Sequence, residues 1–150
     1  MSITKAAPRP INIRQFFGIK SLDYSLLGRW IGHFSRRQFS HKNIIRATPI
    51  ENEKAIGWTA HYLIGITFAV VLLCIWGIDW TNNPTIFPAF IVGILTIIAP
   101  FFIMQPAFGF GIAASKTANP KVARIRSFIT HSVYGIGLYL SALILKFLLD

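Results

Sequence analysis

The stretch GWTAHYLIGITF, residues 57–68, decides the fold class of this chain because it opens a long apolar run. Three such runs contain no Asp, Glu, Lys or Arg: Ala55–Trp76, Ile86–Met104 and Ser127–Leu145. Each has about 19–22 residues, enough for a helix to cross the roughly 30 Å hydrocarbon core of a membrane. The runs lack the alternation of barrel strands, and a helix satisfies its own backbone hydrogen bonds in lipid. The sequence therefore predicts an all-α, multi-pass membrane protein with three spans.

The distribution of charge predicts the topology of these spans. The formal net charge is +10, and ten of the fifteen Lys and Arg residues precede the first run. Four more lie between the second and third runs, whereas the short connection around Asp79 has none. Because Lys and Arg gather in the cytoplasmic loops of membrane proteins, we expect a cytoplasmic N-terminus and an external Asp79 loop. This pattern argues against nucleic acid as a partner and for the lipid bilayer.

The residues divide into a basic cytoplasmic segment, 1–54, and a three-helix transmembrane domain, 55–150. Within the first, residues 21–34 place apolar side chains on one helical face: Leu22, Leu26, Leu27, Trp30, Ile31 and Phe34. This segment is too short to span, so we predict a helix in the membrane interface, with Leu27 facing lipid and Arg29 facing water. The alternative is a helix packed on the protein's own loops.

Capping signals predict where the helices begin and break. TPIE, residues 48–51, reads as a capping box with Pro49 in the first helical position. Asn83–Pro84 and Asn119–Pro120 repeat the pattern of a cap followed by proline. Pro100 removes a backbone hydrogen bond and is expected to kink the second helix, which QPAFGFG, residues 105–111, then ends.

Two histidines lie inside the predicted spans, at similar depth on helices that run parallel. His61 and His131 each have a small residue four positions before them and a glycine four after: Gly57 and Gly65, Ser127 and Gly135. Residues four apart share a helical face, and small residues let membrane helices approach closely. We therefore expect His61 and His131 to face each other, with Gln105 completing an intramembrane polar cluster.

Three roles for this cluster remain open. The imidazoles can hydrogen-bond one another or nearby polar groups and so hold the helices together. They can instead take part in transport or proton handling, or bind a haem or metal. No cofactor is expected under the first interpretation, and the sequence spells out no catalytic residue.

The connection between the second and third spans has two interpretations. GFGIAASKT, residues 109–117, has Phe110 and Ser115 at the two glycine positions of a phosphate-binding P-loop, so that motif is rejected. We expect instead that its basic residues contact anionic lipid headgroups: Lys116, Lys121, Arg124 and Arg126.

The sequence also resembles a known family. The blocks that carry the resemblance are FFGIKSLDYSLLGRWIGHF (residues 16–34), GWTAHYLIGITFA, LLCIWGIDW, PTIFPAFIVG, APFFIMQPAFGFGIAASKT and RIRSFITHSVYGIGLYL. They arrive in order over residues 16–145 and are similar to small bacterial inner-membrane proteins defined only as a domain of unknown function. Relatives usually carry another hydrophobic helix before the FGI block, where this chain has MSITKAAPRPINIRQ. The resemblance thus implies a bacterial inner membrane and a missing first helix.

The function predicted from these features is that of a non-enzymatic inner-membrane component that acts through helix packing and partners. Those partners would be a second copy of the chain or another membrane protein. A small transporter or channel subunit that uses His61, Gln105 and His131 is the alternative. A haem- or metal-binding membrane protein is the third interpretation.

Overall fold

The computed structural model describes residues 23–149, which form helices and contain no strand. The all-α prediction is therefore confirmed for these residues. The predicted lack of a first hydrophobic helix falls on residues 1–22 and so lies outside the described residues, as does the start of the predicted interfacial helix.

Three helices are long and apolar enough to cross a membrane. They are α3 (Glu53–Trp76), the interrupted helix Ile86–Ala107, and α6 (Pro120–Leu149). The prediction of three spans is thus confirmed, with α6 extending beyond the predicted run at both ends. The connection that contains Asp79 joins the first two spans and forms a short 3₁₀ turn, η3 (Ile78–Thr81).

The second span is broken where the sequence predicted a kink. It consists of α4 (Ile86–Leu95), a π-helical turn η4 (Pro100–Met104) and α5 (Gln105–Ala107). Pro100 has no amide hydrogen, so the regular helical ladder cannot pass through it. The wider turn continues the chain instead, with the amide of Gln105 donating to the carbonyl of Pro100.

The predicted start of the first helix is displaced. The first span begins at Glu53 rather than near Pro49, because Asn52 has a left-handed backbone with a φ of 57°. Thr48 makes no capping bond; instead the Glu53 carboxylate accepts the amide hydrogen of Ile50. The second span begins at Ile86, where the predicted apolar run begins. The start of α6 at Pro120 is confirmed.

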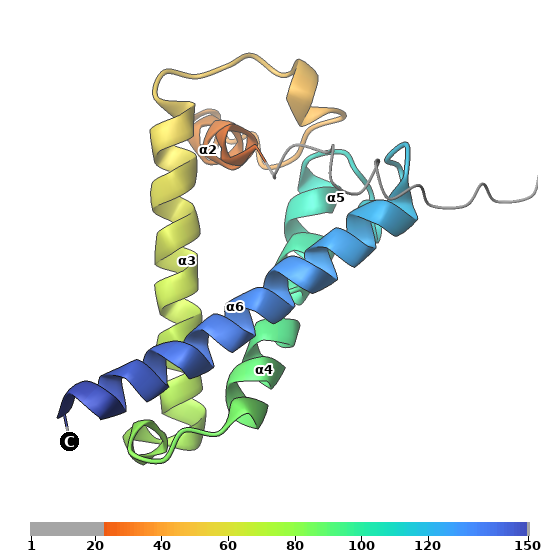
Figure 1. Cartoon of the computed structure of the whole chain (residues 1–150). Helices are drawn as coiled ribbons and strands as arrows, with labels where there is room; N and C mark the ends of the chain where they lie inside the picture. Colours follow the sequence, from red (N-terminus) through yellow and green to blue (C-terminus); the bar gives the residue numbers. More distant parts are fainter. Residues whose placement is uncertain (1–22, 150) are drawn as a thin grey trace, which may run out of the picture.

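Figure 1 shows two packed pairs of helices. The helix α2 (Tyr24–Gly32) lies against the beginning of α3, and α6 crosses the second span. Correspondingly, the buried apolar residues form two clusters. One contains Leu27, Ile44 and Phe108, and the other contains Leu72, Ala89 and Val92.

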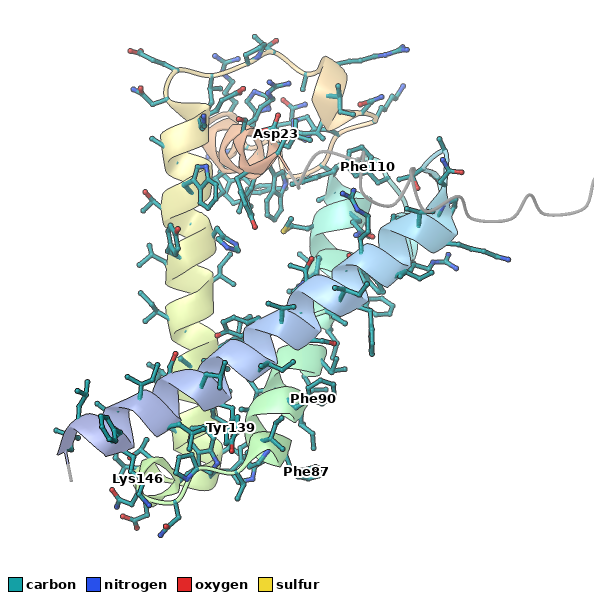
Figure 2. The ribbon with its side chains drawn as sticks, in the orientation of Figure 1. Asp23, Phe87, Phe90, Phe110, Tyr139 and Lys146 are labelled. Carbon is teal, nitrogen blue, oxygen red and sulfur yellow. The ribbon has the colours of Figure 1, made fainter. Side chains whose placement is uncertain are left out.

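We name residues 23–52 the polar cap. It comprises α2, the 3₁₀ turns η1 (His33–Arg36) and η2 (Ile44–Arg46), and the loops between them. In Figure 1 the cap lies at the end of the molecule where α3 and α6 begin. Asp23 and Phe110 lie at this same end (Figure 2). Lys146 and Tyr139 lie at the opposite end (Figure 2).

Candidate functional site

The polar cap is seated on α3 at a crossing of two glycines. A side chain added to Gly28 would collide with the backbone carbonyl of Glu53, and one added to Gly57 would collide with that of Tyr24. The two backbones therefore approach as closely as only glycine permits. Gly57, which the sequence assigned to packing between the first and third spans, contacts the cap instead.

Arg29 and Glu53 tie the cap to α3 beside this crossing. The guanidinium Nε and Nη2 donate to the two carboxylate oxygens, each over 2.8 Å. Its Nη1 donates to the carbonyls of Ile44, Ile45 and Ala47 at 3.1–3.2 Å. These hydrogen bonds satisfy the guanidinium of Arg29, a residue that is only 9% exposed as a whole. The hydrogen bond to Glu53 is the main cause that raises the pKa of Arg29 above its usual value. Burial of Arg29 acts in the opposite direction but is the smaller effect.

The predicted contrast between Leu27 in lipid and Arg29 in water is wrong. Both side chains are buried, Leu27 in the core of the cap and Arg29 in its hydrogen bonds. The helix therefore packs on the protein itself, which was the alternative interpretation of residues 21–34. Helical periodicity shows which side chains share a face of the helix. It could not show that Arg29, on the polar face, would bond to Glu53.

A second buried group in the cap contains two histidines. His33 Nδ1 lies 2.7 Å from His41 Nε2, and His33 Nε2 lies 3.0 Å from the Thr48 carbonyl oxygen. A carbonyl only accepts, so Nε2 of His33 donates to Thr48, and neutral His33 accepts from His41. His41 Nδ1 is buried and has no hydrogen-bond partner among residues 23–149. The neutral pair thus leaves one ring nitrogen without a proton or a partner.

Burial is the main cause that lowers the pKa of His41, and the neighbouring His33 lowers it further. The backbone carbonyl of Ala107 acts in the opposite direction. At neutral pH His41 is therefore expected to carry no charge.

The cap also joins the segment that follows the second span. The amide of His41 donates to the Ala107 carbonyl over 2.7 Å, and that of Ile44 donates to Phe108 over 3.0 Å. Gly109 has a φ of 85°, and a side chain there would collide with the carbonyl of Lys42. The cap therefore connects the start of the first span to the end of the second.

The intramembrane histidines have separate partners. His131 Nδ1 donates over 2.5 Å to the hydroxyl of Thr96, which in turn donates to the Gly93 carbonyl. The His61 ring packs against Tyr24, with ring centroids 4.2 Å apart, and against Trp58. No hydrogen bond joins His61 to His131 or Gln105 within residues 23–149. The hydrogen bond of His131 is thus with α4, and the ring contacts of His61 are with the cap and with its own helix.

The remaining predicted site residues lie as follows. Gly135 meets the backbone of Gly93, so that it packs against α4. Gly65 accepts a 2.6 Å hydrogen bond from the Tyr134 hydroxyl, which joins α3 to α6. Ser127 is buried, and Gln105 Oε1 is buried without a hydrogen-bond partner in the described chain.

The predicted headgroup-contacting residues are clustered at the cap end of the molecule. Lys116, Lys121 and Arg124 are exposed, and Arg124 Nε donates to the carbonyl of Ala113 over 2.8 Å. Arg126 directly precedes the apolar run of α6 and is partly buried.

Sequence reasoning missed the two most connected groups, Arg29–Glu53 and His33–His41. The signal for the first was present: Arg29 interrupts an apolar helix, and Glu53 immediately precedes an apolar span. No periodicity links His33 to His41, because the irregular loop between them determines their contact.

Replacing Thr96 by Val should destabilise the protein modestly, since His131 would lose its acceptor. Side-chain hydrogen bonds inside membranes contribute about 0.6 kcal/mol, and at most about 2. Thr96→Ser keeps the hydroxyl and should retain most of the stability. Thr67→Val is the control, because the Thr67 hydroxyl is exposed and bonds only to Leu63 of its own helix. Thermal unfolding in detergent measures all three, and equal melting temperatures for Thr96→Val and wild type would contradict the assignment.

The family relationship of the chain follows from comparison with known proteins. A family described as "Protein of unknown function (DUF2938)" matches residues 10–145. The chain belongs to this family. No curated protein and no solved structure is detectably similar to it. In this member of the family, residues 23–149 form a cap joined to an apolar three-helix domain.

Within residues 23–149, no three His, Cys, Asp or Glu residues are grouped so that they could hold a metal ion.

Proposed function

We propose that this DUF2938 protein is a non-enzymatic component of the bacterial inner membrane that works through helix packing and partner proteins. The observation that carries the proposal is that the protein's polar side chains join one structural element to another. Arg29 joins the cap to Glu53, His131 joins α6 to Thr96, and Tyr134 joins α6 to α3. Each of these groups bridges two elements, as expected of a protein whose polar residues hold helices together.

The apolar surface supports a role for partners. Many large apolar side chains of α3 are exposed, including Leu63, Ile66 and Ile75 at 58–62%. Tyr62 is 63% exposed among them, although it carries a hydroxyl. Phe87 and Phe90 lie on the side of α4 that faces away from α3 (Figure 2). We propose that lipid covers most of this surface and that a second membrane protein or copy of the chain covers the face around Tyr62.

Photo-crosslinking in cells tests the proposal. A benzoylphenylalanine placed at Tyr62 should give a discrete protein adduct, because the residue faces outward. The same probe at Leu72, which is 2% exposed, is the control and should give none. Cross-links from position 62 to lipid alone would contradict a function through partner proteins.

We further propose that the cap faces the cytoplasm and the Asp79 loop faces outward, in line with the distribution of Lys and Arg. In a Cys74→Ala background, Asn82→Cys should react with an impermeant thiol reagent in intact cells, since Asn82 is exposed. Lys42→Cys, in the cap, should react only after lysis. The reverse labelling pattern would overturn this orientation.

A small transporter subunit is the second candidate. It is favoured by two oxygens, Gln105 Oε1 and Ser132 Oγ, which are buried without hydrogen-bond partners in the described chain. The π-helical turn lies directly before Gln105, and such turns occur frequently at functional sites. Proton or ion flux into proteoliposomes that Gln105→Leu abolishes would favour this candidate over the first. A haem band in the visible spectrum of the purified protein would favour the third interpretation, a haem carrier.

A further inference from the structure

Two hollows open on the surface where the cap meets the connection between the second and third spans. One, of about 520 Å³, is lined by Gln38, Ser40, His41, Lys42, Asn43, Arg46 and Ala47. The other, of about 470 Å³, is lined by Ser40, His41, Lys42, Pro106, Gly109 and Lys116. Ser40, His41 and Lys42 belong to both, so they form the wall that the hollows share.

The lining of these hollows is suited to an anion. Its three charged side chains, Lys42, Arg46 and Lys116, are all basic. The amide oxygen of Asn43 accepts from the backbone of Ile45, which leaves its NH₂ group as a donor. No Asp or Glu lines either hollow, and Glu53 at the start of α3 is already held by Arg29. The hollows therefore offer positive charge and hydrogen-bond donors together.

The frame around the hollows is fixed before any ligand binds. The backbone amides of His41 and Ile44 are bonded to Ala107 and Phe108, and Gly109 packs directly on the Lys42 carbonyl. The Trp30 indole donates to the carbonyl of Phe39 over 2.8 Å. Lys42 and Lys116 are thus presented from two segments whose backbones cannot move apart freely.

We propose that this surface is a binding site for a phosphate group, with Lys42 and Lys116 as its main ligands and Ser40, Asn43 and Arg46 as further donors. A phosphate carries two or more acceptor oxygens and negative charge, and Lys and Arg are the side chains that bind it. The group can belong to an anionic phospholipid or to a soluble phosphate compound. The site lies where the cap meets the connection between the second and third spans, so it is distinct from the intramembrane histidines and does not depend on the proposed function.

His41 couples this site to pH. The charged or titratable groups around it are His33 of η1, Lys42 of its own loop, Arg46 of η2 and Lys116 of the facing segment. The Arg29–Glu53 pair lies beyond His33. Histidine is the side chain whose ordinary pKa lies in the physiological range, whereas the ordinary pKa values of Lys and Arg lie far above it. The neutral pair has room for one more proton, at His41 Nδ1. A bound anion would stabilise that proton, so phosphate binding should strengthen as the pH falls.

Binding to the full-length protein in neutral detergent tests the site with two probes, short-chain phosphatidylglycerol and inorganic phosphate. Phosphatidylglycerol is a diester that does not titrate between pH 5 and 8, so any pH dependence of its binding comes from the protein. Wild type should bind it about tenfold more tightly at pH 5 than at pH 7.5. Binding of the lipid alone identifies a headgroup site, and binding of inorganic phosphate alone identifies a site for a soluble compound.

Variants separate this site from general attraction to a basic protein. Lys42→Gln with Lys116→Gln should weaken binding at least about tenfold, as expected for the loss of charge-assisted hydrogen bonds. Both lysines are exposed, so the variant should keep the wild-type melting temperature. The control is Lys121→Gln, an exposed lysine at the start of α6 outside both hollows, which should bind like wild type. His41→Gln should bind with no pH dependence. Equal losses in the Lys121 and Lys42/Lys116 variants, or no binding of either probe, would overturn the proposal.

Discussion

Gly28→Ala and Gly57→Ala are each expected to detach the polar cap from α3. In both variants the new Cβ meets a backbone carbonyl, of Glu53 or of Tyr24, which cannot turn aside as a flexible side chain can. Overpacking of this kind costs typically about 1–3 kcal/mol, and we expect values near the upper end because both backbones must separate. Detergent-solubilised protein should show a lower melting temperature and faster proteolysis within residues 33–52.

Gly137→Ala is the matched control for these substitutions. Gly137 lies in α6, and a side chain there would meet no atom within 4 Å. Alanine is the better helix former, so this variant should be as stable as wild type or more stable by up to about 1 kcal/mol. If Gly28→Ala and Gly57→Ala melted like Gly137→Ala, the close crossing of α2 and α3 would be wrong.

Glu53→Leu is expected to have the largest effect of any single change of charge. It would leave the buried guanidinium of Arg29 without its carboxylate, and breaking a buried ion pair by removing one partner costs about 3–5 kcal/mol. The side chains of Arg29 and Glu53 are only 11% and 17% exposed, so solvent screens the pair weakly.

Glu51→Leu, two residues away, provides the comparison. Glu51 is exposed, and its loss should change the stability by less than about 0.5 kcal/mol. Thermal unfolding of both variants under one set of conditions gives the contrast. Equal stability losses would show that Glu53 acts as an ordinary surface carboxylate.

The spans were predictable because a membrane imposes one simple requirement on sequence. A helix that crosses lipid must be long and free of charge, so the apolar runs from Ala55 and Ile86 identified two helices directly. Pro100 predicted the break in the second because proline lacks an amide hydrogen, whatever its surroundings. The start of α6 at Pro120 followed from equally local chemistry.

The cap and the histidine contacts depended on tertiary structure and could not be predicted in the same way. Gly57 and Gly135 share a pattern of spacing, but one packs on α2 and the other on α4. Spacing shows which residues lie on one face of a helix, whereas it does not show which element covers that face. The prediction of a capping box at Thr48 was wrong for a related reason. The Thr48 carbonyl bonds to His33, and the carboxylate that accepts a backbone amide hydrogen before the helix is that of Glu53 and not that of Glu51.

The central claim of this account is that buried polar side chains hold the cap on the first span. A double-mutant cycle on Arg29→Met and Glu53→Leu tests it most directly, with the free energy of unfolding measured for wild type, both single variants and the double variant. Because the two residues are in direct contact, we predict a coupling energy of about 1.5–3 kcal/mol, with the double variant more stable than Glu53→Leu alone. Additive losses, with a coupling within about 0.5 kcal/mol of zero, would contradict the claim.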